Sequence, residues 1–420
     1  MKSALSETIL RLDAGEVTSQ ELIESALETI DVHHAVEQRI EYSRVEALEA
    51  DSRRANGVKK SAIDGIPFGV KANIDIKGIV TTSGARNNEV PATQDGWIVS
   101  RLRELGAIPT LTTTMAEGAL GAVTANAFTG SCSNPVNPKL NAGGSSGGSA
   151  AIVGSGALPF SIGSDTMGSV RIPAAYCEIV GYKPSRESIS NQGLVRLAED
   201  FDSIGVLATS VRDLVSILSP LLSSLQNVAY APIDPSTMKI VGSHLSTHAD
   251  AVGQDAVSNI LSRLGASGQI APHDFDAGAI RRAGLLICEL EGSASLGLLG
   301  SPTQPGFSNE FLSIMNFVNT LPPAKILEAK DKISQFQNQA SALFKTFDVM
   351  VLPTTAAGAP DLNENPSGAA DLAAWVNIAG LAALSIVEPT TRRSVQLVGE
   401  SDQKILNLGL WLENQPNTNH

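Results

Sequence analysis

The sequence has few of the residues that cross-link or stabilise small folds. Only three cysteines, Cys132, Cys177 and Cys288, occur in 420 residues, and none lies in a CxxC pair or a metal-binding spacing. So sparse and odd a set argues against a disulfide scaffold and favours a reducing compartment. Aromatic residues make up only 4% of the chain. The core must therefore be built from aliphatic and small side chains.

Positive charge is also scarce, and long apolar runs are missing. The formal net charge is -13 at pH 7, and no basic patch suits phosphate contacts, so we expect no direct nucleic-acid binding. No run of 18 strongly apolar residues occurs, so we expect no membrane span. The N-terminal residues include acids and lack a long apolar region, which argues against a signal peptide. The expected location is the cytoplasm.

Local patterns predict an α/β protein. Thr18 and Glu21 form a capping box ahead of an apolar helical pattern, and a second helical pattern covers about 44–55. From Gly65 onward, short apolar strands alternate with helices, which is typical of a largely parallel, buried sheet. Further strands are expected at 66–70, 107–111, 239–242, 348–352, 384–387 and 394–398, and further helices at 96–105, 251–264, 276–290, 323–347 and from 401.

The length and the 43% apolar content suit one large domain or two ordinary ones. No Pro/Ser-rich linker divides the chain, so we expect a single domain over 1–420. Its expected parts are N-terminal helices (1–60), a core (about 61–225), an appended smaller layer (about 230–310) and the C-terminal part of the core (311–420).

The segment 143–169 stands apart because 15 of its 27 residues are Gly or Ser. Its only charged residue is Asp165. Glycine lets backbone amides converge on one point and serine supplies hydroxyls, which suits phosphate binding or acyl transfer. A P-loop needs a lysine directly after its glycines, and none follows here. A tight turn that lets a strand and a helix pack closely is the structural alternative.

A histidine base is not evident beside any candidate nucleophile. None of the six histidines lies in a glycine-rich turn, and no G-x-S-x-G or HExxH motif occurs. We expect the i,i+4 pair His244 and His248 to be surface residues rather than metal ligands. A lysine can serve as base when burial lowers its pKa. Lys71, at the end of an apolar strand, fits this role, although a lone lysine at a strand end is commonly a surface residue.

These motifs together resemble the amidase signature family of serine hydrolases. The hallmark is GGSSGGSAA, which begins at Gly143, followed by GSDTMGSVRIPAAYCEIVGYKPS from Gly163, with GIPFGVKANI upstream from Gly65. The resemblance runs from about Thr18 to the C-terminal helix. It includes TTSGA (81–85), RLRELGAI (101–108), SNPVNP (133–138), FDSIG (201–205), FDVMVLPT (347–354) and VQLVG (395–399).

The resemblance implies a fold and a set of site residues. The fold is one large α/β/α domain with a mixed, mostly parallel central sheet covered by helices on both faces. By motif position, Ser169 is the nucleophile, Ser145 the bridging serine and Lys71 the buried base. In the family the peptide bond at the bridging serine is cis. Asp165 and Arg171 are expected to form a buried polar scaffold. The implied oxyanion and substrate-binding residues are Thr166, Met167, Gly168, Ser146, Gly118 and Ala119, with Glu117 beside the last two.

The implied activity is hydrolysis of a small or medium carboxylic amide, or a urea-like amide, through a seryl acyl-enzyme. Ammonia or an amine is released, and no metal or organic cofactor is required. Two alternatives stay open: an A-type subunit of glutamyl-tRNA amidotransferase, and a catalytically silent binding protein. The expected partners are a small-molecule amide and a second copy in a homodimer, with no nucleic acid and no membrane. The sequence shows no obvious carboxylate-binding arginine, and it does not name the substrate.

Two departures from the family pattern concern glycine positions. Met167 and Glu178 stand where the family usually has Gly. A non-glycine residue forced into a left-handed conformation costs about 1–2 kcal/mol. The sequence therefore leaves the shape of the turn before Ser169 open, and Met167 could also protrude into the substrate pocket.

Overall fold

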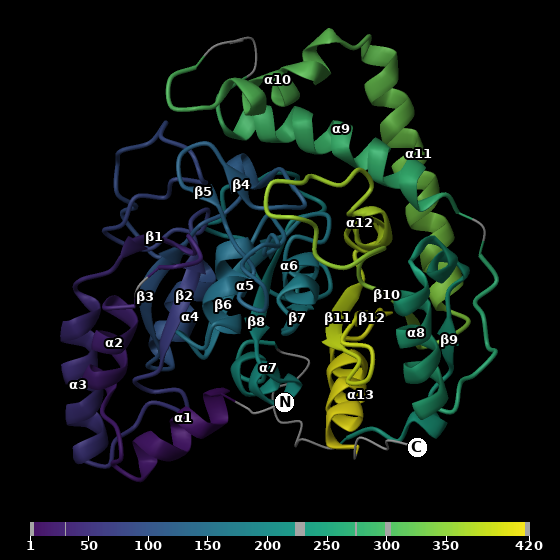
Figure 1. Cartoon of the computed structure of the whole chain (residues 1–420). Coiled ribbons are helices and arrows are strands. Elements are labelled where there is room, and N and C mark those ends of the chain that lie inside the picture. The colour runs from purple at the N-terminus through teal and green to yellow at the C-terminus, as the bar shows by residue number, and fades with distance from the viewer. Residues whose placement is uncertain (1–3, 30, 223–231, 274, 299–303, 416–420) are drawn as a thin grey trace.

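The computed structural model describes residues 4–29, 31–222, 232–273, 275–298 and 304–415 (Figure 1). A ten-stranded sheet runs through the molecule in the order β1-β3-β2-β6-β8-β7-β11-β12-β10-β9. A short hairpin of β4 (Ala125–Asn126) and β5 (Gly130–Ser131) lies outside it. The strands of the large sheet are β1 (Val36–Arg39), β2 (Pro67–Lys71), β3 (Ile108–Thr113), β6 (Phe160–Asp165), β7 (Val180–Lys183), β8 (Ser203–Ala208), β9 (Ile240–Gly242), β10 (Val349–Pro353), β11 (Ala382–Val387) and β12 (Ser394–Gly399).

Helices cover both faces of the sheet, as expected. Alternate side chains of one strand enter opposite cores: Val349 and Val351 of β10 pack in one cluster, and Met350 and Leu352 in the other. The first cluster includes residues of α1 (Ala4–Asp13), α4 (Trp97–Glu104), α7 (Val211–Leu218), α8 (Ala251–Arg263) and α13 (Asp402–Asn414). The opposite face carries α2 (Ser19–Leu27), α3 (Ser43–Ala55), α5 (Gly147–Gly154), α6 (Arg171–Tyr176), α9 (Ala277–Ser295), α11 (Pro323–Phe344) and α12 (Asp371–Ile378).

The mixed sheet is confirmed, but the expectation that most of it is parallel is wrong. Three neighbouring pairs are parallel, β2 with β3, β2 with β6, and β9 with β10, whereas the other six are antiparallel. Parallel neighbours need a long crossover, usually a helix. The chain instead passes from β7 to β8 without a helix, and a six-residue turn (388–393) joins β11 to β12 as a hairpin. Local apolar runs predict a strand but not the direction of its neighbour.

The elements that the sequence predicted are confirmed to within a few residues. Thr18 caps α2 with its side chain, and Glu21 completes the capping box. The helices predicted near 44, 96, 251, 276, 323 and 401 correspond to α3, α4, α8, α9, α11 and α13. The boundary expected between about 225 and 230 lies outside the described residues, so the division into parts stays a prediction.

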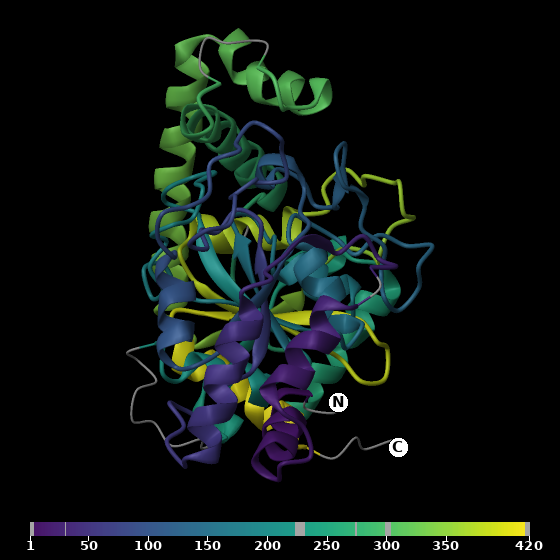
Figure 2. The ribbon, with the colours of Figure 1, turned by 90° about the vertical axis from the view of Figure 1, so that its left-hand side faces the viewer.

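Two long helices and a shorter one form a layer at one end of the molecule. In both ribbon views α9, α10 (Asn309–Phe317) and the upper part of α11 extend beyond the sheet, and α9 crosses above α12 (Figures 1 and 2). Helix α9 packs against α10, α11 and α12. In the described part of the chain, no helix combines the length and the apolar character that a bilayer crossing requires.

Candidate active site

Lys71 is the last residue of β2, and its side chain is fully buried. Its Nζ donates to Ser145 Oγ and to Ser164 Oγ, each at 2.8 Å. Asn73 Nδ2 donates to the same Ser164 hydroxyl at 3.0 Å. The lysine is therefore held in place by two serine hydroxyls, one of which belongs to the glycine- and serine-rich turn that precedes α5.

Burial changes the protonation of this lysine. Removal from water lowers the pKa of Lys71 to about 7, although the negative charges of Asp165 and Asp202 oppose the shift. At neutral pH a large share of the amine is therefore uncharged. A neutral amine that is hydrogen-bonded to a serine can accept a proton from it.

Ser145 lies in a tightly packed turn that leads into α5. The Gly144–Ser145 peptide bond is cis, as the resemblance implied. Position 144 requires glycine for the close packing of this turn on Val123. A Cβ there would lie only 2.5 Å from the Val123 carbonyl carbon. The carbonyl of Ser145 accepts a hydrogen bond from Ala116 N at 3.1 Å, which anchors the turn to the segment after β3.

Ser169 lies in the turn between β6 and α6 and is 7% exposed. Ser146, which follows Ser145, connects the two turns. The Ser146 N–H donates to the Ser169 carbonyl, and the Ser146 Oγ donates to the Ser164 carbonyl, both at 3.1 Å. Two turns that are separate in the sequence are therefore held together by Ser146.

The backbone amides of the turn before Ser169 differ in whether they form a hydrogen bond within the protein. Gly168 N–H donates to Asp165 Oδ1 at 2.7 Å, so it is engaged within the protein. Among the hydrogen bonds of the described residues, none uses the N–H of Thr166, Met167 or Ser169 as donor. Thr166 is fixed through its side chain, which donates to Asp202 Oδ1 at 2.6 Å. Within the described residues, these three amides therefore have no hydrogen-bond acceptor, and Thr166, Met167 and Ser169 all line one cavity.

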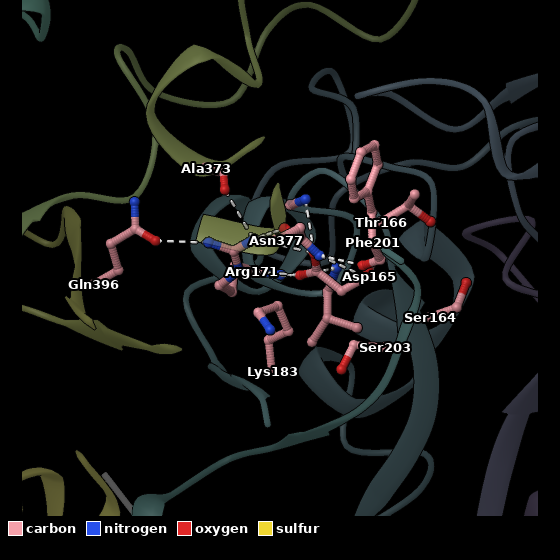
Figure 3. A network of polar contacts seen from close by, with 12 residues as sticks. Ser164, Asp165, Thr166, Arg171, Lys183, Phe201, Ser203, Ala373, Asn377 and Gln396 are labelled. Carbon is pink, nitrogen blue, oxygen red and sulfur yellow. Dashed lines mark hydrogen bonds and ion pairs between the residues drawn. The ribbon is translucent and has the colours of Figure 1, made fainter. Parts of the chain in front are cut away.

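The carboxylate of Asp165 and the guanidinium of Arg171 form a fully buried ion pair beneath this turn (Figure 3). Burial alone would raise the pKa of Asp165, but the charge and hydrogen bonds of Arg171 hold it well below its usual range. Arg171 also donates to Gln396 Oε1 at 2.8 Å, to Asn377 Oδ1 at 2.5 Å and to the Ala373 carbonyl at 3.1 Å. The network ties the turn to α12 and β12.

A cavity of about 300 Å³ opens in front of Ser169. Of the residues that the sequence singled out, Ser169, Thr166, Met167 and Ala119 line it. Gly118, Gly168 and Ser146 are not among its lining residues. The remaining walls come from Leu120, Gly121, Ala122, Gly144, Ile172, Leu197, Arg281, Leu285, Ile314 and the segment 365–370.

Glu117 and Gly118 do not line the cavity and instead contact residues at the start of α10. The Glu117 carboxylate accepts hydrogen bonds from Ser308 N at 2.8 Å and Ser308 Oγ at 2.6 Å, at the N-terminus of α10. Gly118 has a φ of 59°, and a Cβ there would lie 2.2 Å from Phe311 Cζ. These residues set the position of a helix beside the cavity.

Met167 and Glu178, the two residues that stand where the family usually has glycine, differ in backbone conformation. Met167 is not among the non-glycine residues with positive φ, so the strain considered for it does not arise. Its side chain reaches α9, where a Cβ on Gly284 would lie 2.7 Å from Met167 Cε. Glu178 does adopt a φ of 54°, and it forms an ion pair with Arg392, whose φ is 60°.

Sequence reasoning missed several residues of the site. Arg281 and Leu285 of α9 line the cavity, as does Ile314 of α10. Ser164 contacts Lys71 directly. No local motif marks the α9 and α10 residues, because they reach the cavity only through the packing of helices that follow the signature segment in the chain. Lys71 and the serines of the 143–169 segment could be predicted, because each lies in a motif that is contiguous in the sequence.

Comparisons with known proteins identify the family of this chain. The family model described as Amidase matches residues 20–241. The chain is 31% identical over 377 residues to the AtzE subunit of the 1-carboxybiuret hydrolase of Pseudomonas sp. (strain ADP), a match that covers 84% of this chain and 82% of that protein.

Two further similarities differ in extent. The A-type subunit of the glutamyl-tRNA(Gln) amidotransferase of Endomicrobium trichonymphae is 36% identical over 229 residues, which is 53% of this chain but only 47% of that protein. A solved structure described as a vestigial complex that reveals the evolutionary origins of an s-triazine catabolic enzyme superposes with a TM-score of 0.88 at 27% identity, over 99% of this chain and 98% of that one. The match to the family model and the long match to the biuret-hydrolase relative together show that the chain belongs to the amidase family.

Proposed function

We propose that this protein is a serine amidase in which Lys71, Ser145 and Ser169 relay protons to cleave a C–N bond. The observation that carries the proposal is the 2.8 Å hydrogen bond between Lys71 Nζ, fully buried, and Ser145 Oγ. A buried lysine with a pKa near 7 has no need of a histidine partner to act as a base at neutral pH.

Acylation begins with the neutral amine of Lys71. The amine accepts a proton from Ser145, Ser145 accepts one from Ser169 Oγ, and Ser169 attacks the carbonyl carbon of the amide. The amides of Thr166, Met167 and Ser169 stabilise the negative oxygen of the tetrahedral intermediate. One such donor typically lowers the barrier by about 3–4 kcal/mol.

Collapse of the intermediate releases ammonia or an amine. The proton passes back from Lys71 through Ser145 to the leaving nitrogen. Water then attacks the acyl-enzyme by the same relay, and the carboxylic acid leaves. Every proton transfer uses a residue of this chain, so the proposed reaction needs no metal or organic cofactor.

The size and lining of the cavity favour a small or medium amide. A cavity of about 300 Å³ accommodates a modest molecule, at the lower end of the range typical of small-molecule sites. The relative named as part of a 1-carboxybiuret hydrolase suggests a urea-like amide as one class of substrate. A homodimer and a cytoplasmic location stay predictions.

An A-type amidotransferase subunit is the second candidate, because one such subunit is 36% identical to this chain over 229 residues. The match covers less than half of that protein, so it supports the shared fold more strongly than the shared assembly. Glutamine hydrolysis that depends on added partner subunits would favour this candidate. Hydrolysis of small amides by the isolated chain would favour the amidase.

The test of the proposed function is ammonia release from a panel of small amides, ureas and aryl amides. The wild type, Ser169→Ala and Ser155→Ala are compared; Ser155 follows α5 and bonds to the Ile152 carbonyl. We expect wild-type turnover of at least one amide, a loss of about 10³-fold or more in Ser169→Ala, on the order seen when a catalytic nucleophile is removed, and no loss in Ser155→Ala. Turnover that persists in Ser169→Ala would refute the proposal. No turnover of any amide would favour the catalytically silent binding protein.

A further inference from the structure

One charged side chain faces the active-site cavity. Among the lining residues that the structure describes, Arg281 alone carries a charge. It lies on α9 one turn before Leu285, which lines the same cavity, because residues four apart share a helix face. Ser169 reaches the cavity from the β6–α6 turn, so the nucleophile and the guanidinium are contributed by different layers of the fold.

Asp371 holds the Arg281 guanidinium by one edge. Arg281 Nε donates to Asp371 Oδ1 at 2.5 Å. Asp371 opens α12, its own N–H donates to the Gly368 carbonyl at 2.9 Å, and it is not among the cavity-lining residues. The aspartate therefore fixes the arginine without itself lining the cavity.

The other edge of the guanidinium is free to bind. Within the described part of the chain, the bond from Nε is the one hydrogen bond that Arg281 makes through its side chain. A guanidinium has five N–H donors, and its two Nη groups form a fork that matches a carboxylate. The remaining walls are mainly apolar, so a bound carboxylate would have less competition from water than at an open surface.

We propose that Arg281 binds a carboxylate on the substrate, at a position separate from the amide that is cleaved. The inference rests on the proposed amidase function and narrows its substrate to an amide of an anionic acid. Asp371 is a positioning residue in this account. The competing interpretation is that Arg281 and Asp371 only join α9 to α12, in which case the charge of the substrate does not matter.

The test uses pairs of substrates that have the same shape and differ in charge. Malonamate, succinamate and glutaramate cover three spacings, and each is compared with the neutral amide in which an isopropyl group replaces the carboxylate. The variants are Arg281→Gln, Arg281→Lys and the control Arg282→Gln. Arg282 is the next residue of α9, its side chain is 63% exposed, and it does not line the cavity.

For at least one spacing, we expect the wild type to prefer the carboxylate by about tenfold or more in kcat/KM. Arg281→Gln should lower that preference by about 10- to 100-fold, the usual range for losing a hydrogen bond to a charged group. Arg281→Lys should retain part of it, because the charge stays but the fork is lost. Arg282→Gln should leave kcat/KM unchanged for both the carboxylate substrate and its neutral analogue. An equal loss for the charged and neutral amides in Arg281→Gln would overturn the inference in favour of a purely structural ion pair.

A binding measurement separates this inference from the amidase mechanism. In the Ser169→Ala background, calorimetry should detect the preferred carboxy-amide, and Arg281→Gln should weaken that binding about tenfold or more. Neutral amides that are hydrolysed through Ser169 with no preference for a carboxylate would overturn the inference and leave the proposed function intact. Absence of Ser169-dependent hydrolysis of every amide would overturn both.

Discussion

At the scale of single residues, the buried lysine lowers the stability of the fold. Lys71 is fully buried, and its pKa is lowered to about 7 chiefly by burial. Its hydrogen bonds to Ser145 and Ser164 offset only part of that cost. Residues kept for catalysis are often destabilising in this way.

The substitution Lys71→Met should abolish activity and increase the free energy of unfolding by about 2 kcal/mol at pH 7. The folded state keeps the amine neutral above about pH 7, while the unfolded state binds a proton below about 10.5. The unfolded wild type therefore binds more protons between these values, and its stability rises with pH across that window.

Urea unfolding of both proteins at pH 7 and pH 10 checks this prediction. The advantage of Lys71→Met should shrink toward pH 10, because the variant lacks this proton uptake. Burial also lowers the pKa of Lys183 to about 7. Because Lys183 is present in both proteins, its contribution cancels when their free energies of unfolding are compared. An advantage that grows with pH would contradict the assignment of a neutral Lys71.

At the scale of elements, the docking of α10 depends on one glycine. Gly118 has a φ of 59° and faces the ring of Phe311, which leaves no room for a Cβ. Glu117 accepts two hydrogen bonds from Ser308 at the start of the same helix. The 117–119 turn thus controls how α10 lies beside the active-site cavity.

We expect Gly118→Ala to lower the free energy of unfolding by about 2–3 kcal/mol, through backbone strain and overpacking against Phe311. Gly57→Ala is the matched control, since Gly57 has a φ of 68° with no atom within 4 Å of a Cβ. The control should lose about 1 kcal/mol from strain alone. Adding Phe311→Leu to Gly118→Ala should cost less than the sum of the single changes in denaturant unfolding. Strict additivity would rule out the contact as the cause.

At the scale of the whole molecule, a buried network joins the two halves of the sheet. Arg171 connects the β6–α6 turn, through Asp165, to Asn377 of α12 and Gln396 of β12 (Figure 3). Gln396 in turn donates to the carbonyls of Pro353 and Leu372. The turn that carries Ser169 is therefore fixed by parts of the chain that lie far from it in sequence.

Arg171→Met should cost about 3–5 kcal/mol of unfolding free energy, because it leaves the Asp165 carboxylate buried without its counter-charge. Arg196→Met, which removes an arginine from the exposed pair with Glu199, should cost less than about 1 kcal/mol. Urea unfolding measures both. A loss below about 1 kcal/mol for Arg171→Met would mean that the network is not what holds the turn.

The sequence predicted what is local and missed what depends on tertiary packing. The capping box at Thr18 and the apolar runs of β2 and β10 identified their elements, because those signals act within a few residues. The direction of β8 beside β6 and β7, and the approach of Arg281 to the cavity, depend on long-range packing. Glu117 and Ala119 are two residues apart, yet Glu117 binds Ser308, the N-cap residue of α10, and Ala119 lines the cavity.

The rate of labelling by a fluorophosphonate as a function of pH, with the adduct located by mass spectrometry, tests most directly whether Lys71 is the base that activates Ser169. We predict a single adduct on Ser169, formed at a rate that rises with pH through a pKa near 7 and then levels off. In Lys71→Met, labelling should be slower by about 10²-fold or more, on the order expected for loss of a general base, and should not show that inflection. An adduct on another serine would show that Ser169 is not the nucleophile, and a wild-type rate that does not change between pH 6 and 9 would show that Lys71 is not its base.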